Sequence, residues 1–132
     1  MSSSKLFWLF GSPGSGKTSI AHTVAQIFDE HHRLAGCFFC DSSDTDRRSP
    51  KAIMPTIAYQ LAKWHEDYRS IILDILQSRG ELDIYAGIQR QFDLLVSQPI
   101  SGSSVRLPPK HRPLIIVLDA LDESCDSVNS RR

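Results

Sequence analysis

Residues 11–18, Gly-Ser-Pro-Gly-Ser-Gly-Lys-Thr, constrain the fold of this chain more than any other stretch of its sequence. They match the pattern G-x-x-x-x-G-K-[ST] in full, and this pattern marks a phosphate-binding loop when a strand precedes it and a helix follows it. The apolar run Leu6–Phe10 comes just before and predicts a buried strand. Apolar residues recur behind it at helical spacing, namely Ile20, Ala21, Val24, Ala25, Ile27 and Phe28. The sequence therefore predicts the strand, loop and helix that open an α/β nucleotide-binding fold.

The residue types in this loop suit a phosphate group. Its glycines let backbone N–H groups approach phosphate oxygens at the positive end of the following helix. Lys17 brings a cation to the β- and γ-phosphates and is assigned a catalytic role, and Thr18 offers a hydroxyl ligand to Mg²⁺. The predicted nucleotide contacts are Gly11, Ser12, Pro13, Gly14, Ser15, Gly16, Lys17, Thr18 and Ser19. The alternative, a glycine-rich turn without a ligand, is disfavoured by the flanking strand and helix patterns.

A second apolar run covers residues 114–118 and ends in Asp119. Such a run predicts a strand of a parallel sheet covered on both faces. Ligands bind at the carboxyl ends of the strands in open α/β sheets, so we expect Asp119 beside the glycine loop as a second Mg²⁺ ligand. Asp122 and Glu123 follow, and we assign the activation of water to them, with Glu123 preferred. The alternative is that these three acids only cap a turn into a following helix.

Five stretches together resemble the NACHT-type NTPases of the STAND class, in particular a fungal form that is similar to the nephrocystin-type N-terminal ATPase domain. They are residues 11–18, 37–41, 47–51, 55–62 and 114–123. The resemblance implies a P-loop NTPase fold of the α/β class, with three αβα layers around a parallel sheet. Residues 1–132 would form one partial NACHT domain, with Walker A at 11–18 and Walker B at 114–123.

The same resemblance implies binding of ATP or GTP with Mg²⁺, slow hydrolysis, and use of the nucleotide state as a conformational switch. Lys17 and Thr18 match the Walker A pair, and Asp119 matches the Walker B metal acid. Asp122 and Glu123 match the extra acidic pair of the NACHT pattern. Arg47 or Arg48 matches a basic position that has no assigned role. The resemblance also implies C-terminal helical and repeat domains in a full-length relative, and nucleotide-dependent self-association.

In such ATPases a fourth strand follows the Walker B strand and inserts between the first and the third. Only residues 124–132 follow that position in this sequence. We therefore expect a fold that is incomplete at its C-terminus. Its first and third strands either keep unpaired backbone or are forced together in a different sheet.

Three other functions share parts of this pattern: a P-loop small-molecule kinase, a GTPase and a non-catalytic nucleotide-binding fragment. A P-loop small-molecule kinase would need an acceptor site, and the doubled acid at residues 122–123 suits water activation better. A GTPase is disfavoured because Asn129 is the sole asparagine, which leaves no Asn-Lys-x-Asp base reader. A non-catalytic nucleotide-binding fragment remains open.

Composition and charge limit the binding partners and the cellular location that we expect for this chain. The 15 basic and 15 acidic residues give a net charge of zero, which argues against general affinity for nucleic acid or membranes. No apolar run approaches the length of a membrane span, so a cytoplasmic location is expected. Cys37 and Cys40 lie on a predicted strand, where residues three apart face opposite sides. With Cys125 they are therefore expected to be reduced thiols without a metal.

Hydrophobic periodicity, together with the positions of proline and glycine, predicts the remaining elements. We expect a strand over residues 34–40, a loop over 41–51, a helix over 55–64 with Pro55 as its first residue, amphipathic helices around 68–76 and 84–96, and a flexible loop over 97–113.

Overall fold

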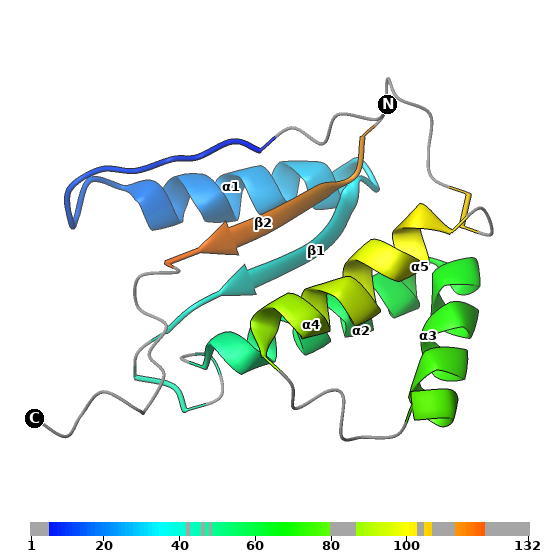
Figure 1. Cartoon of the computed structure of the whole chain (residues 1–132). Coiled ribbons are helices and arrows are strands. Elements are labelled where there is room, and N and C mark those ends of the chain that lie inside the picture. Colours follow the sequence, from blue (N-terminus) through cyan, green and yellow to red (C-terminus); the bar gives the residue numbers. More distant parts are fainter. Residues whose placement is uncertain are drawn as a thin grey trace, which may run out of the picture.

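The computed structural model describes residues 6–41, 43–45, 47, 49–79, 87–102, 105–106 and 113–120. These residues form a mixed α/β structure whose two strands pair in parallel (Figure 1). The elements in chain order are α1 (Lys17–Glu30), β1 (Leu34–Phe39), the 3₁₀ turn η1 (Pro50–Ala52), α2 (Ile53–Trp64), α3 (Glu66–Arg79), α4 (Ile88–Phe92), the π-helical turn η3 (Asp93–Ser97), α5 (Gln98–Ser101) and β2 (Ile115–Asp119).

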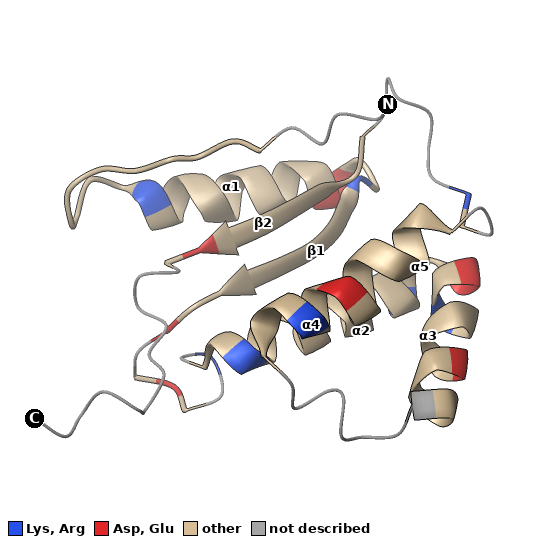
Figure 2. Ribbon diagram, in the orientation of Figure 1, with Lys and Arg blue, Asp and Glu red and all other residues tan. Residues whose placement is uncertain are grey.

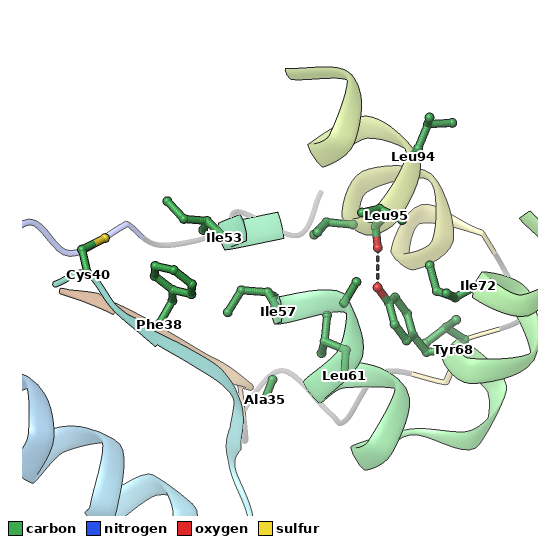
Figure 3. Close-up of a cluster of buried hydrophobic side chains, with 13 residues drawn as sticks. Ala35, Phe38, Cys40, Ile53, Ile57, Leu61, Tyr68, Ile72, Leu94 and Leu95 are labelled. Carbon is green, nitrogen blue, oxygen red and sulfur yellow. Dashed lines mark hydrogen bonds between the residues drawn. The ribbon is translucent and has the colours of Figure 1, made fainter. Parts of the chain in front are cut away.

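The parallel pair β1 and β2 forms the centre of the described structure. The register runs from Leu34 opposite Ile115 to Phe39 opposite Asp119, with one irregularity between Leu34 and Gly36. Parallel strands need a long crossover, and the helices between β1 and β2 supply it. α1 packs against one face of the pair and α2 packs against β1 from the other (Figures 1 and 3).

α1 forms where the apolar residues after the glycine loop predicted a helix, and the helical repeat explains which side meets the sheet. Ala25 is buried and Ala21, Val24 and Phe28 are half-buried, which is the i, i+3, i+4, i+7 spacing of one helix face. Ile27, which the sequence placed on the same stripe, is 47% exposed.

The main core lies between β1, α2, α3 and the α4–α5 helix (Figure 3). It contains Ala35, Phe38, Cys40, Ile53, Ile57, Ala58, Leu61, Tyr68, Ile72, Leu94, Leu95, Val96 and Val105. The core therefore occupies the side of the sheet away from α1, where an apolar helix face meets an apolar strand face.

Two residues allow α2 to approach β1 closely. The side-chain amide of Gln60 accepts the N–H of Cys37 at 2.6 Å and donates to the Cys37 carbonyl at 3.0 Å, so it pairs with the strand as a neighbouring backbone would. A Cβ on Gly36 would lie 3.1 Å from the Gln60 Oε1 and 3.1 Å from the Ile57 Cδ1. Glycine at position 36 therefore admits the Ile57 and Gln60 side chains against the strand.

The last helix, residues 88–101, widens into a π turn at η3 for a reason visible in the sequence. Pro99 has no N–H to donate to the Leu95 carbonyl four residues earlier, and its ring would clash with that carbonyl in an α-helix. The hydroxyl of Tyr68, on α3, donates to the Leu95 carbonyl instead (Figure 3). The proline thus creates an acceptor that a buried tyrosine satisfies.

We expect Tyr68→Phe to lower the free energy of unfolding by about 1–3 kcal/mol, because it leaves a buried carbonyl without its donor. Tyr59→Phe is the matched control, since that side chain is 66% exposed and should cost little. Urea unfolding of the three proteins measures both values. Equal losses in the two variants would contradict this role for Tyr68.

Burial also raises the pKa of the Tyr68 phenol well above its ordinary value. The folded protein therefore holds Tyr68 neutral in a pH range where the unfolded chain ionises it. This contribution is complete below the unfolded pKa of about 10 and is lost as pH rises above it. Thermal melts between pH 8 and 11 should show the wild type losing stability relative to Tyr68→Phe at the alkaline end.

The prediction of a strand at the start of the chain was wrong for the described residues. Residues 6–10 form no strand, and their side chains are exposed, with Leu6 at 88%, Phe7 at 87% and Phe10 at 81%. An apolar run becomes a strand only when another strand pairs with its backbone. In the described part of the chain, β1 and β2 pair with each other alone.

The prediction that β2 is covered on both faces was also wrong. Ile116 is 42% exposed and Leu118 is 38% exposed, while their neighbours are half-buried. This alternation is typical of a strand with one face toward solvent.

Several boundaries differ from the predicted ones. α2 begins at Ile53, which places Pro55 at the third helical residue, where a missing N–H is still harmless. The helix predicted over 84–96 is observed from Ile88 and continues to Ser101, into the predicted loop. Ile84, Arg48, Asp122, Glu123 and Cys125 lie outside the described residues.

Candidate functional site

The glycine loop and the start of α1 form a turn with an open backbone. Gly14 has a φ of 75° and Gly16 a φ of 92°, in the left-handed region that side chains other than glycine rarely adopt. The Ser15 N–H donates to the Ser12 carbonyl at 3.2 Å and closes the turn. Gly16 is the N-cap of α1 and offers no side-chain cap. The first N–H groups of the helix therefore have no partner from the N-cap, which is the arrangement that suits an anion.

Lys17 lies at the centre of this loop. Its Nζ donates to the carbonyl of Gly11 at 2.7 Å and to that of Ser12 at 2.9 Å, and it lies 3.5 Å from the Ser15 Oγ. An ammonium group has three donors, and all three point into the loop here. The Lys17 ammonium therefore contacts the backbone of the loop that is predicted to bind phosphate.

The remaining loop residues are accessible. Ser12, Pro13, Thr18 and Ser19 are all exposed, with Thr18 and Ser19 in the first turn of α1. A ligand could therefore reach the Thr18 hydroxyl without any rearrangement of the core.

Asp119 is the last residue of β2 and is half-buried. Its carbonyl accepts the Cys40 N–H at 3.1 Å, which continues the strand pairing to the carboxyl end of β1. Ala120 then turns the chain with a φ of 55°, a conformation that costs a non-glycine residue energy. Asp119 therefore lies at the carboxyl end of β2, as the sequence predicts, and the chain turns sharply out of the sheet directly after it.

The two motifs lie at one end of the molecule. α1 starts on the side where β1 and β2 end, and α1 packs against β2 (Figure 1). Figure 2 shows a basic residue in the first turn of α1 and an acidic residue at the carboxyl end of β2 on that same side. Asp122 and Glu123 fall outside the described residues, so their predicted place beside Asp119 stays a prediction.

A family model described as Nephrocystin 3, N-terminal, matches residues 1–132. The chain belongs to this family. Comparison with curated proteins and with solved structures gives no match. The nephrocystin-type part of the resemblance seen in the sequence is thereby confirmed.

A charged loop follows β1, and it contains Arg47, to which the sequence assigned no role. Arg47 pairs with two carboxylates: its Nε lies 2.9 Å from the Asp44 Oδ2 and its terminal nitrogen lies 3.2 Å from the Asp41 Oδ2. The Asp41 N–H donates to the Arg47 carbonyl at 3.2 Å and closes the loop. Since Asp41 follows Cys40 directly, this loop starts at the same sheet edge as Asp119. The spacing Asp-x-x-Asp-x-x-Arg was the available signal.

Hydrogen bonds to the carboxylate of Asp41 lower its pKa. The hydroxyl of Ser43 donates to its Oδ1 at 2.6 Å and the Ser43 N–H donates at 2.9 Å, and together they lower the pKa of Asp41. The nearby Arg47 lowers it further. Asp41 is therefore held as an anion that fixes the guanidinium of Arg47.

A ring contact that the sequence did not reveal fixes α1 on the sheet. His22 stacks on Phe39 with 4.0 Å between ring centroids and 4° between ring planes. His22 lies little more than one helical turn after Lys17, and Phe39 is the last residue of β1. The contact therefore fixes the start of α1 near the carboxyl end of the sheet.

Two further expectations concern metals and membranes. Cys37 is half-buried and Cys40 is buried, and neither forms a disulfide bond among the described residues. Across the residues that the structure describes, no group of three or more His, Cys, Asp or Glu side chains is arranged to hold a metal ion. No described helix has the length and apolar character needed to cross a membrane.

Proposed function

We propose that this chain binds a nucleoside triphosphate, ATP or GTP, together with Mg²⁺ through residues 11–19. The observation that carries the proposal is the position of Lys17. Its ammonium is held by the carbonyls of Gly11 and Ser12 at the uncapped start of α1. A cation, converging N–H groups and the positive end of a helix all favour a polyphosphate.

The residues present also fit the metal. The Thr18 hydroxyl and the Asp119 carboxylate are hard oxygen ligands, and they belong to elements whose ends lie on the same side of the molecule (Figure 1). Bound Mg²⁺ would supply charge neutralisation for the phosphates. Thr18 and Asp119 would hold and orient it.

Within this proposal, the chain is the nucleotide-binding core of a NACHT-type, STAND-class regulatory NTPase of fungal type. Helices on both sides of a parallel pair support its three-layer P-loop NTPase fold. Glu123, or less favourably Asp122, would orient and deprotonate the attacking water, and the nucleotide state would act as a switch. Cytoplasmic location, further helical and repeat domains, and nucleotide-dependent self-association belong to the same proposal.

Nucleotide binding without hydrolysis is the second candidate, and one observation favours it. Residues 6–10 lead into the loop without strand pairing in the described structure. Catalysis depends on groups held in fixed geometry, and binding tolerates a looser loop.

The test is calorimetric titration with ATP in the presence and absence of Mg²⁺. We expect the wild type to bind more tightly with Mg²⁺. Asp119→Asn should lose this magnesium-dependent gain, because it removes the negative charge at the metal, and should retain its metal-free affinity. Asp74→Asn, an exposed acid on α3, is the control. No ATP binding by the wild type would refute the proposal, and an unchanged magnesium effect in Asp119→Asn would remove Asp119 from the site.

A further inference from the structure

A pocket of about 350 Å³ lies between α2 and α3, apart from the glycine loop. Ala58, Tyr59 and Ala62 line it from α2, and Ile72, Leu73 and Leu76 line it from α3. Each trio has helical spacing, so each is one continuous helix face. The pocket is open to solvent on its outer side, since Tyr59 is 66% exposed and Leu73 is 50% exposed.

The sequence explains why the two helices leave this space. α2 ends at Trp64, His65 is extended with φ −130° and ψ 118°, and α3 starts at Glu66. This short link turns α3 steeply away from α2 (Figure 1). The alanines at positions 58 and 62 have side chains too small to fill the angle between the helices.

The charges of the pocket have one sign and one location. Its lining includes the cations Lys63 and Arg69 and no acidic side chain. Both cations lie close to the link at His65, whereas Pro55 and Leu76 line the far ends of the two helices. The pocket surface is nearly all apolar, so Lys63 and Arg69 line it with their aliphatic stems. Both side chains are exposed, which places their charged groups at the rim of the pocket near the link.

The contacts of the two cations leave them able to meet an anion. The Lys63 Nζ lies over the Tyr59 ring, 5.6 Å from its centroid. The Arg69 guanidinium lies 3.9 Å from the carboxylate of Glu66, which is 87% exposed in its side chain. Such an exposed pair contributes little, so a carboxylate of a ligand can compete with it.

We propose that the α2–α3 pocket binds a small amphiphile with one anionic head and one apolar chain, of the medium-chain fatty acid class. The volume falls in the range of small-molecule sites. Pro55 and Lys63 are eight residues apart on α2, which corresponds to about 12 Å along the helix. This length accommodates a medium-length acyl chain whose carboxylate lies between Lys63 and Arg69. Cations at the rim of one end alone favour such a ligand over a partner helix, which would continue beyond both ends of the pocket.

The experiment compares decanoate with decanol by calorimetric titration, with decanoate kept below its micelle-forming concentration. We expect decanoate to bind with one-to-one stoichiometry. Lys63→Gln should weaken decanoate roughly three- to tenfold, since one charged contact is lost, and should leave decanol unchanged. Lys51→Gln removes a charge outside the pocket and is the matched control.

Ala62→Phe fills the space between the helices and should abolish binding of both ligands. Leu73→Gln is the companion variant if Ala62→Phe does not fold, because this half-exposed side chain can change without disturbing the core. It should weaken both ligands. Unchanged decanoate affinity in these variants overturns the proposal. So does an acidic amphipathic peptide that binds when decanoate does not, since that result indicates a protein partner. None of these measurements depends on nucleotide binding.

Discussion

Replacing Lys17 with alanine should lower the affinity for Mg·ATP roughly ten- to a hundredfold. A hydrogen bond to a charged group contributes about 1.5–3 kcal/mol, and each 1.4 kcal/mol is about a factor of ten. The ammonium of Lys17 already points into the loop, toward the carbonyls of Gly11 and Ser12. A bound phosphate would therefore find the cation in place, and the alanine variant would lose that contact.

Calorimetric titration with Mg·ATP measures this effect, with Lys51→Ala as the control for loss of a lysine outside the loop. Thermal melts of the same proteins without nucleotide check that the fold is retained. Equal affinity for Mg·ATP in the wild type and in Lys17→Ala would show that the loop does not bind nucleotide in the proposed way. A loss in both lysine variants would point to a general charge effect.

The sequence was most informative where a local rule decides the structure. The glycine-rich motif predicted a loop ahead of a helix. Gly14 and Gly16 adopt positive φ in that loop, and α1 starts at Lys17. β1 and the end of β2 at Asp119 followed from apolar runs of β-branched and aromatic residues. The glycine loop thus lies at the start of α1, and Asp119 lies at the end of β2.

The sequence failed where the outcome depends on a distant partner. The run at residues 6–10 has the composition of a strand, but pairing decides whether it becomes one. The π turn at η3 follows from Pro99. The Leu95 carbonyl in this turn accepts a hydrogen bond from Tyr68, which lies on another helix, and no local pattern in the sequence predicts that contact. The pocket between α2 and α3 depends on the angle set at His65, which no periodicity encodes.

The core that holds α2 on β1 should carry much of the stability and none of the nucleotide affinity. Ile57 is 2% exposed and lies against Gly36 of β1, on the side of the sheet away from α1 (Figure 3). Ile57→Ala should lower the free energy of unfolding by about 2–5 kcal/mol, since it removes buried methyl groups and leaves a cavity. That loss is a large fraction of the stability of a domain of this size. Ile27→Ala, at a half-exposed position on α1, should cost far less.

Urea unfolding measures both losses, and thermal melts with Mg·ATP separate stability from binding. A ligand that binds the folded state alone stabilises it by an amount set by its concentration and affinity. Mg·ATP should therefore stabilise Ile57→Ala by the same free energy as the wild type, while Lys17→Ala gains little. If Ile57→Ala lost this stabilisation while still folded, the α2 side of the sheet would be coupled to the loop at α1. If Ile57→Ala and Ile27→Ala lost equal stability, the core would not lie where the structure places it.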